Sequence, residues 1–397
     1  MTRTARSIPF RLYRGGTSKG VFLSADALPA DQAALTPLLL EIFGSPDPRQ
    51  INGLGGADKL TSKAALMGPS AEPDADVDYL FAQVGIRHPE VDFKLNCGNL
   101  TAAAAVYAVD EGLVRAEGDS ATVRIHNVNT HRIIRATVPL RGGVVCEEGD
   151  FAIGGVPGTG APIDLDFAQA TGAITGRMLP LQEVRSVIDV PGHGAFEVSV
   201  LDGPNLIVLA AAHDLGMSGI ETPDEIDGNK ELTARLQAIR ARVAELVGLG
   251  DYWHSRAAPS NPMLVAVRSP CDYLSYTTGE PITADQIHLV CRQYSTSSTS
   301  KALAGTVTAA IGMACRIPGT VASRCLRGGA NDAGLGSTRV EQGDAITLGH
   351  PSGTITVRAA AHECDGRFVI DRAVIQRTSH LIASGEVYVK SLIGSNR

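Results

Sequence analysis

The chain has 397 residues, which is enough for two domains that each bury a core of their own. Hydrophobic residues make up 44% and charged residues 19%, a composition typical of globular proteins and not of disordered chains. The formal net charge of −7 argues against a broad attraction to nucleic acid or to anionic membranes, so neither is expected as a partner.

The N-terminal residues Met1–Arg14 contain arginines but no apolar run of the kind seen in secretory signals, and no stretch approaches the length of a membrane span. The seven cysteines are scattered, and none forms a Cys-x-x-Cys pair. This spacing disfavours a zinc ribbon, an iron–sulfur cluster and a disulfide framework. We therefore expect a cytoplasmic protein without a metal.

Turn residues separate short β-rich runs along most of the chain, and helices are fewer. The first predicted helix begins at Thr36, with Pro37 in its first turn, and ends at Gly44. A longer one runs from about Asp224 to Val247, and its apolar residues recur at helical spacing, as in a surface helix. Typical strand runs are Ala121–Ile125, Arg132–Val138, Phe196–Leu201, Leu206–Ala210, Met263–Val267 and Thr354–Val357.

Two further helices, Leu100–Val109 and Thr306–Ala314, consist of small or apolar residues on every side, which predicts complete burial. When Cys97 is aligned with Ala304, their glycines, threonines and alanines match, which indicates an internal duplication. We predict an α+β (α/β) fold of two pseudo-symmetric domains, each a curled sheet or barrel around a central buried helix. The expected domains are 1–190 and 191–375, divided by the turn at Asp189–Gly194, with 376–397 returning to the first half.

Three Thr-Ser-Lys triplets end at Lys19, Lys63 and Lys301, and the first two follow or lie within glycine-rich stretches. Glycines allow a close approach of the backbone to a ligand, and these side chains donate hydrogen bonds to carboxylates or phosphates. Ordinary loops with solvated lysines remain an alternative. A phosphate-binding P-loop is excluded because Val21 follows Gly20, where a lysine is required.

The tetrapeptide Asn96–Cys97–Gly98–Asn99 precedes the first buried helix. A helix N-terminus favours negative charge and offers free N–H groups to a carboxylate. Cys97 is therefore a candidate functional thiol, although a buried, inert cysteine that packs as a small hydrophobe is the alternative.

Several motifs identify a family resemblance that runs along nearly the whole chain. They are RGGTSKG (14–20), GSPDPRQINGLGGADKLTSK (44–63), DADVDYLFAQV (74–84), NCGNL (96–100), IPGT (317–320) and GHPSGT (349–354). These segments resemble the PrpF family of methylaconitate, 2-methylitaconate and 4-oxalomesaconate isomerases, which have the diaminopimelate-epimerase-like fold. Two positions differ from the residues of related proteins. Ala304 occupies the position of the second cysteine of the fold's epimerases, and Lys301 stands where relatives have histidine.

The resemblance implies a cofactor-independent isomerase or tautomerase that carries out an allylic proton shift, or a cis–trans isomerisation, on a small unsaturated di- or tricarboxylic acid. It assigns the base to Lys63 and its catalytic partner to Cys97. A non-catalytic accessory protein for an iron–sulfur dehydratase is the alternative, and a homodimer or higher homo-oligomer is left open. Residues expected to bind substrate are Arg14, Gly15, Gly16, Thr17, Ser18, Lys19, Ser62, Asn96, Gly98, Asn99, Leu100, Ser300, Lys301, Gly305, Thr306, His350 and Ser352.

Overall fold

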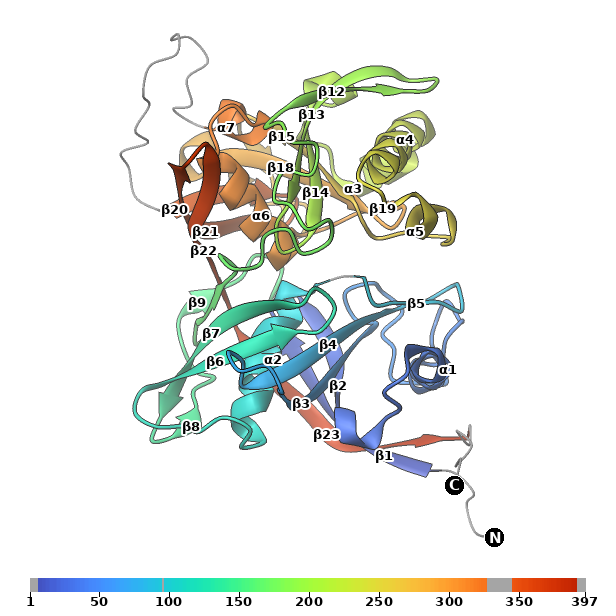
Figure 1. Ribbon diagram of the computed structural model, residues 1–397, viewed down its shortest axis with the longest axis vertical. Coiled ribbons are helices and arrows are strands. Elements are labelled where there is room, and N and C mark those ends of the chain that lie inside the picture. The colour runs from blue at the N-terminus through green and yellow to red at the C-terminus, as the bar shows by residue number, and fades with distance from the viewer. Residues whose placement is uncertain (1–5, 95, 327–344, 391–397) are drawn as a thin grey trace. The chain divides into compact units, whose positions relative to one another are not determined.

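The computed structural model describes residues 6–94, 96–326 and 345–390. They form two compact units, which are described separately (Figure 1). Of the described residues, unit 1 contains 6–94, 96–152, 158–165 and 377–390, and unit 2 contains 153–157, 166–326 and 345–376. None of the helices in these residues is long and apolar enough to cross a membrane.

Unit 1 is built from a curled sheet and two helices. The helices are α1 (Gln32–Phe43) and α2 (Gly98–Asp110), with a short 3-10 turn η1 (Ala25–Ala27). The strands are β1 (Arg6–Gly15), β2 (Ser18–Ser24), β3 (Lys63–Pro69), β4 (Val77–Val84), β5 (Val91–Asp92), β6 (Ser120–Asn127), β7 (Arg132–Arg141), β8 (Val144–Val145), β9 (Phe151–Ala152), β10 (Thr159–Gly160), β11 (Ile163–Asp166, whose last residue belongs to unit 2) and β23 (Ser379–Val389).

Unit 2 contains a second set of strands and more helices. These are α3 (Pro223–Gly228), α4 (Lys230–Leu246), α5 (Gly250–His254), α6 (Gly305–Arg316), α7 (Val321–Cys325), η2 (His213–Leu215) and η3 (Ala284–Gln286). The strands are β12 (Ser186–Val190), β13 (Gly194–Asp202), β14 (Leu206–Ala211), β15 (Met263–Arg268), β16 (Tyr273–Leu274), β17 (Pro281–Ile282), β18 (Leu289–Ser295), β19 (Ser298–Thr299), β20 (Ala345–His350), β21 (Gly353–Cys364) and β22 (Arg367–Arg377, whose last residue belongs to unit 1).

The strands of the two units repeat one pattern of pairing. In unit 1 the order β1–β2–β3–β4–β6–β7 is paired antiparallel, parallel, antiparallel, parallel and antiparallel. In unit 2 the order β13–β14–β15–β18–β20–β21 is paired in the same senses. In each unit one helix, α2 or α6, enters the chain between the fourth and fifth of these strands. The predicted pseudo-symmetric duplication is therefore confirmed by the topology.

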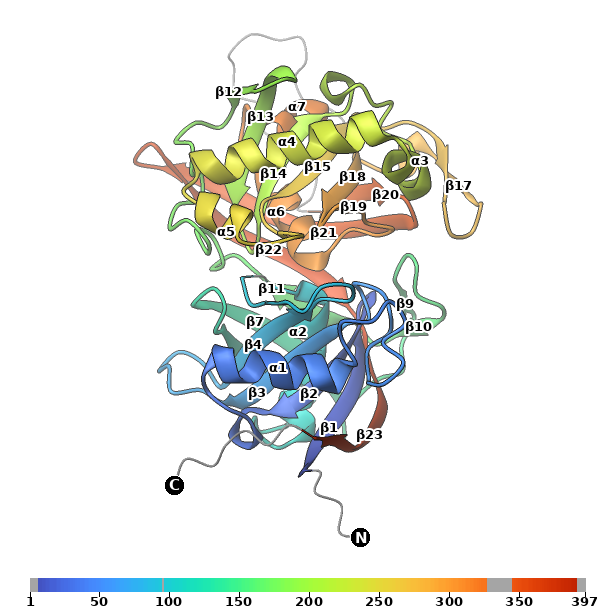
Figure 2. The same cartoon turned by 90° about the vertical axis from the view of Figure 1, so that its right-hand side faces the viewer.

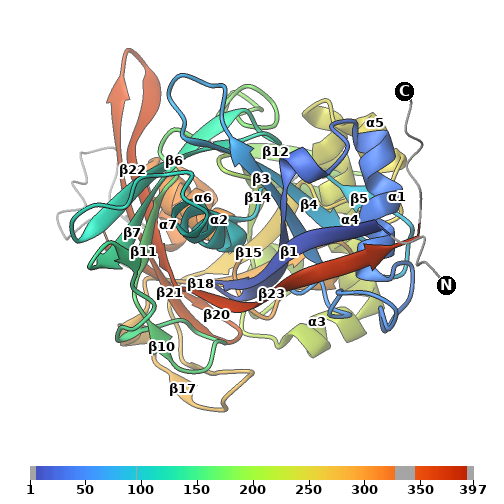
Figure 3. The same cartoon turned by 90° about the horizontal axis from the view of Figure 1, so that it is seen from below.

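Both of these helices are buried as the sequence predicts. Every residue of α2 from Gly98 to Val109 is buried, and so is every residue of α6 from Gly305 to Cys315. Small side chains allow this: a Cβ atom on Gly312 of α6 would lie only 2.7 Å from Val357 on β21. In the view of Figure 3, α2 lies among the strands of unit 1.

Amphipathic helices cover the outer side of each sheet. In Figure 2, α1 lies across unit 1, and α4 lies with α5 on the outside of unit 2. Leu35, Leu39 and Phe43 of α1 join one apolar core with residues of β2, β3 and β4. Four apolar residues of α4 join another with residues of β13, β14 and β15, which leaves the interior of each curled sheet to α2 or α6.

Three predictions about element boundaries are corrected. The first helix begins at Gln32 and not at Thr36, because Asp31 caps it by accepting a hydrogen bond from the N–H of Ala34. The predicted helix 224–247 is two helices, because Asn229 ends α3 and caps α4. The turn at Asp189–Gly194 joins β12 to β13 inside unit 2 and does not divide the units, since Pro-Gly turns serve hairpins as well as linkers.

Candidate active site

Lys63 and Cys97, the two predicted catalytic residues, are in contact. Lys63 is the first residue of β3, and Cys97 is the N-cap residue of α2. The Lys63 Nζ donates a hydrogen bond to the Cys97 Sγ at 3.3 Å. The two residues are only 8% and 6% exposed. The ammonium or amine group also lies 5.4 Å from the centre of the Phe81 ring, so it is held between an aromatic face and a sulfur atom.

The N-terminus of α2 leaves the Cys97 side chain available for this contact. Cys97 has extended backbone angles, φ −119° and ψ 92°, and its side chain makes no capping hydrogen bond. Its carbonyl oxygen accepts the first helical hydrogen bond, from the N–H of Thr101 at 2.9 Å. The preceding N–H groups of the first turn have no acceptor within the helix, and they provide partial positive charge beside the sulfur.

The glycines of the RGGTSKG turn fit closely against this end of α2. A Cβ atom on Gly15 would lie 2.3 Å from the carbonyl oxygen of Asn99, and one on Gly20 would lie 2.5 Å from Leu100. Gly16 has φ +51°, and a Cβ atom there would lie 2.4 Å from the Asn99 side chain. These glycines allow β1 and β2 to approach the helix, and so they fix its N-terminus relative to Lys63.

Asn99 connects this turn to a buried arginine. Its Nδ2 donates to Thr17 Oγ1 at 2.9 Å and to Ser18 Oγ at 3.2 Å, and its Oδ1 accepts from Arg377 Nε at 2.8 Å. Arg377 is 1% exposed. Burial lowers the pKa of Arg377 to about 10, and negative charge on Cys97 acts against that shift. A cation therefore lies close to the candidate thiol.

Arg377 is the site residue that the sequence analysis missed. It follows Asn99 by 278 positions, lies in no glycine-rich motif and sits within an ordinary strand pattern. Only the pairing of the C-terminal strand β23 with β1, in which Ser379 lies opposite Gly15, brings this part of the chain to α2. No local signal in the sequence indicates this position.

Arg14 and Lys19 lie on opposite sides of the turn. The Arg14 guanidinium donates to the carbonyl oxygens of Gly16 and Thr378, each at 3.1 Å, and to Thr378 Oγ1 at 2.9 Å. Burial lowers the pKa of Arg14. Lys19 is paired with Arg14 in the β1–β2 ladder and is half-buried. Arg14 thus clamps the turn in place.

The loop before Lys63 is held by buried polar side chains. Ser62 Oγ donates to Gln50 Oε1 at 2.7 Å, and Gln50 in turn donates to Ser45 Oγ at 2.9 Å. Gln83, opposite Lys63 on β4, donates to the carbonyl oxygen of Ser62 at 3.0 Å. These bonds fix the direction from which the Lys63 side chain leaves the strand.

The predicted residues of the second half form their own group in unit 2. Ser352 Oγ donates to the carbonyl oxygen of Lys301 at 2.6 Å, and the Ser352 N–H donates to His350 Nδ1 at 3.2 Å. Ser300, His350 and Ser352 are buried, whereas Lys301 is exposed. Thr306, in the first turn of α6 after Gly305, accepts a hydrogen bond from Asn205 at 2.7 Å.

Unit 2 has no counterpart of the lysine–cysteine pair at the equivalent positions. Met263 is the first residue of β15, as Lys63 is of β3, and Ala304 is the N-cap of α6, as Cys97 is of α2. Neither side chain can give or take a proton at neutral pH. The alignment of Cys97 with Ala304 made from the sequence therefore matches the structure.

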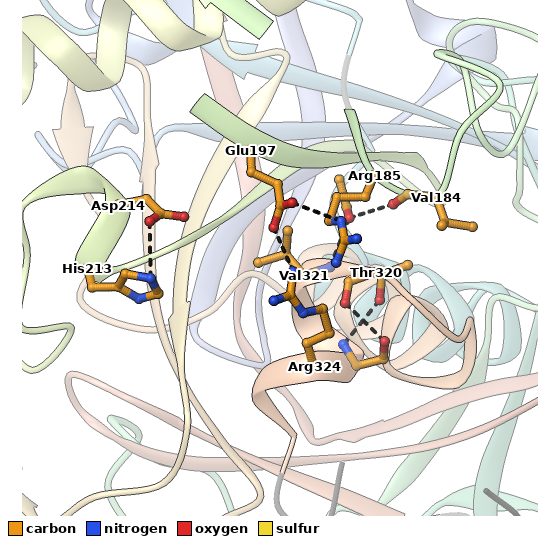
Figure 4. Close-up of polar contacts among 10 residues, drawn as sticks. Val184, Arg185, Glu197, His213, Asp214, Thr320, Val321 and Arg324 are labelled. Carbon is orange, nitrogen blue, oxygen red and sulfur yellow. Dashed lines mark hydrogen bonds and ion pairs between the residues drawn. The ribbon is translucent and has the colours of Figure 1, made fainter. Parts of the chain in front are cut away.

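A separate cavity of about 470 Å³ in unit 2 contains none of the predicted residues (Figure 4). The charged side chains drawn there are paired. Glu197 bridges Arg185 at 3.0 Å and Arg324 at 2.8 Å, and His213 lies 3.0 Å from Asp214. We therefore keep the candidate site in the lysine–cysteine group. In the described part of the chain, no cluster of three or more His, Cys, Asp or Glu residues could hold a metal ion.

Known proteins with similar sequences are isomerases. The family model described as PrpF protein matches residues 5–390. The chain is 42% identical to 3-methylitaconate isomerase of Eubacterium barkeri, over 96% of this chain and 97% of the relative. It is 36% identical to 2-methyl-aconitate isomerase of Shewanella oneidensis, with 95% of each chain covered. It is 37% identical to (4E)-oxalomesaconate Delta-isomerase of Novosphingobium sp., over 98% of this chain and 99% of the relative.

Solved structures extend the likeness to the fold. The crystal structure of methylitaconate-delta-isomerase matches with a TM-score of 0.78 and 41% identity, covering 99% of this chain and all of that one. A hydroxyproline epimerase from Agrobacterium vitis shares the fold at 12% identity, with a TM-score of 0.57 over 99% of this chain and 96% of that one. From the full-length family match and these relatives, the chain belongs to the PrpF family and is an isomerase.

Proposed function

We propose that this isomerase shifts a proton along the allylic system of a small unsaturated di- or tricarboxylic acid without a cofactor. The observation that carries the proposal is the buried 3.3 Å contact between Lys63 Nζ and Cys97 Sγ at the N-terminus of α2. An amine and a thiol in contact can remove one proton and deliver another within a single site. The substrates in the relatives' names, methylitaconate, methylaconitate and oxalomesaconate, belong to this class of acid.

The reaction begins with proton abstraction by neutral Lys63 from the carbon next to a carboxylate and a C=C bond. The electron pair of the broken C–H bond enters the conjugated system, which becomes a delocalised dienolate. The Cys97 thiol then delivers its proton to the far allylic carbon, and the double bond is left in its new position. Lys63 is now an ammonium and Cys97 a thiolate.

Direct proton transfer across the 3.3 Å contact then restores both groups. The amine and thiol that began the cycle are regenerated, so no further acid or base is needed. Transfer over a hydrogen bond of this kind is fast compared with breaking a C–H bond. Because of the short contact, the lysine and the cysteine can restore each other's protonation state after each turnover.

Negative charge that develops on the dienolate and its carboxylates needs fixed positive partners. The first-turn N–H groups of α2 supply one, and the buried Arg377 guanidinium, held by Asn99, supplies another. Lys19 is a third cation on the adjacent turn. Arg14 acts at least through its clamp on that turn.

A panel of unsaturated di- and tricarboxylates incubated in deuterated water, followed by proton NMR, tests the proposal. At least one acid should isomerise and exchange its allylic hydrogen. Lys63→Met should lose both processes by at least about 100-fold, because both begin with the same abstraction. Lys230→Met, which makes the same change at an exposed lysine of α4, should keep them. Deuterium exchange that persists in Lys63→Met would assign the base to another residue.

The alternative of a non-catalytic accessory protein predicts stable binding to a partner enzyme and no turnover of any acid in the panel. The similarity to named isomerases gives that alternative no support. The same NMR experiment separates the two, because the accessory protein would leave every acid unchanged.

A further inference from the structure

The contact between Lys63 and Cys97 places a nucleophilic nitrogen against an oxidisable sulfur. Lys63 Nζ donates to Cys97 Sγ at 3.3 Å, and both residues are nearly buried. The lysine side chain is a flexible four-carbon stem, so Nζ can move from contact distance to bonding distance while β3 and α2 stay in place. In the parts of the chain that the structure describes, none of the other six cysteines makes a hydrogen bond with a lysine.

Positive groups surround this sulfur on more than one side. Lys63 Nζ is in contact with it, and the first-turn N–H groups of α2 lie beside it. The buried Arg377 guanidinium, held by Asn99, is close enough for negative charge on Cys97 to oppose the lowering of the Arg377 pKa by burial. Positive charge stabilises a thiolate, and the thiolate is the form of cysteine that attacks a peroxide. Hydrogen peroxide is also smaller than the acids that the site is proposed to bind.

We propose that hydrogen peroxide converts this pair into a covalent sulfenamide bridge between Lys63 Nζ and Cys97 Sγ, which a thiol reductant opens again. The formation of the bond rests on the contact alone, whereas its effect on activity rests on the proposed function. The bridge leaves neither a free amine nor a free thiol, so isomerisation stops until the bridge is reduced. It also protects the sulfur from the irreversible sulfinic and sulfonic stages of oxidation.

The bridge forms in two steps, in which one peroxide is reduced and two water molecules are released. First, the Cys97 thiolate attacks a peroxide oxygen: the S–O bond forms, the O–O bond breaks, and the sulfur is oxidised to a sulfenic acid. The hydroxide that leaves takes a proton from the Lys63 ammonium and becomes water. Second, the neutral Lys63 amine attacks the sulfur: the N–S bond forms and the S–O bond breaks. The second hydroxide leaves as water with a proton from the nitrogen.

The main-chain nitrogen of Gly98 is the competing partner for the oxidised sulfur. A sulfenic acid can close a ring on a neighbouring backbone nitrogen, and Gly98 directly follows Cys97. An amide nitrogen is a weak nucleophile, because its lone pair is delocalised into the carbonyl group. The Lys63 amine keeps its lone pair on nitrogen and is already in contact with the sulfur, so it captures the sulfenic acid first.

Peptide mapping of the full chain after treatment with hydrogen peroxide tests the bond. Trypsin cleaves after lysine and arginine, so the bridge should join peptide 60–87, left uncleaved at Lys63, to peptide 95–115, which contains Cys97. The linked product should be lighter by two hydrogen atoms than the sum of the two peptides, and dithiothreitol added before digestion should remove it. A ring closed within peptide 95–115, a linked product that keeps an oxygen atom, or the absence of any linked product would each overturn the proposal.

Lys63→Arg separates oxidation of the sulfur from bridging. The guanidinium keeps a positive charge beside Cys97 but stays protonated, so it cannot attack the sulfenic acid. With dimedone, which traps sulfenic acids, this variant should be labelled at Cys97 at least about tenfold more than the unsubstituted chain. Lys19→Arg makes the same exchange at the half-buried lysine of the adjacent turn and should still form the bridge. Equal labelling of Cys97 in Lys63→Arg and the unsubstituted chain, or loss of the bridge in Lys19→Arg, would refute the assignment of Lys63 as the partner.

Discussion

Gly15→Ala tests how the active site is positioned. Gly15 ends β1, and a Cβ atom there would lie 2.3 Å from the Asn99 carbonyl oxygen and 3.1 Å from the Ala103 Cβ. An ordinary contact begins at about 3.4 Å, so the two backbones must separate by about 1 Å. The obstacle is a helical carbonyl group, which cannot rotate away as a flexible side chain could. Because Asn99 lies two residues after Cys97, the displacement reaches the thiol.

A misplacement of about 1 Å in a catalytic site can reduce the rate by about 100-fold, and overpacking of this kind costs about 1–3 kcal/mol of stability. Gly15→Ala should therefore remain folded at 25 °C and lose kcat by roughly that factor, measured with whichever acid the NMR panel identifies. The unfolding free energy should be measured by urea titration in parallel.

Gly68→Ala is the matched control, because Gly68 lies on the same strand as Lys63 and a Cβ atom there meets only Ala25 at 3.5 Å. It should keep both kcat and stability. Full activity in Gly15→Ala would refute the argument that the glycine turn fixes the position of α2. A loss of activity in Gly68→Ala would show that any added methyl group near β3 is harmful.

Three further predictions concern cofactors, pH and stability. Activity should survive prolonged chelator treatment and dialysis. A loss of activity that added divalent ion reverses would contradict a cofactor-free reaction. Burial by itself raises the pKa of Asp76, but the hydrogen bonds from Arg124 together outweigh burial and lower that pKa. The stabilisation that the Asp76–Arg124 pair gives the fold is therefore present above about pH 4 and is lost as the pH falls. Urea titrations should show that Asp76→Asn loses less stability between pH 6 and pH 3 than the unsubstituted chain, by up to about 1 kcal/mol; an equal loss would contradict this. Arg240→Ala should lower the free energy of unfolding by about 3 kcal/mol in the same assay, because fully buried Arg240 donates to three carbonyl groups of the 259–262 loop. A decrease below about 1 kcal/mol would contradict that role.

The sequence predicts the central elements of the fold because their composition leaves few alternatives. Helices made only of small and apolar residues, as in Leu100–Val109 and Thr306–Ala314, have no polar face and can only be buried. The alignment of Cys97 with Ala304 then identifies the two halves. The ends of helices are harder to predict from the sequence. Asn229, inside the predicted 224–247 helix, serves as a cap, and apolar periodicity does not reveal that role.

The candidate site shows a similar division between local and distant information. Lys63 and Cys97 lie in recognisable motifs, and the structure brings them into contact. For the first glycine turn, the sequence predicts that Gly15 and Gly16 let the backbone approach a ligand. The close contacts that the structure shows for these two glycines are with α2. Arg377 could not be predicted, because its place beside Asn99 depends on the pairing of strands at opposite ends of the chain.

The absence of a proton-transferring pair at Met263 and Ala304 has a stereochemical consequence. The two groups that we propose handle protons, Lys63 Nζ and Cys97 Sγ, lie 3.3 Å apart in unit 1, so they would reach the substrate from one side. The proton should therefore leave and return on the same face of the allylic system. A substrate stereospecifically deuterated at the allylic carbon, with the product configuration read by NMR, measures this directly. Return of the proton to the opposite face would require a donor outside this pair and would refute the assignment of Cys97 as the acid.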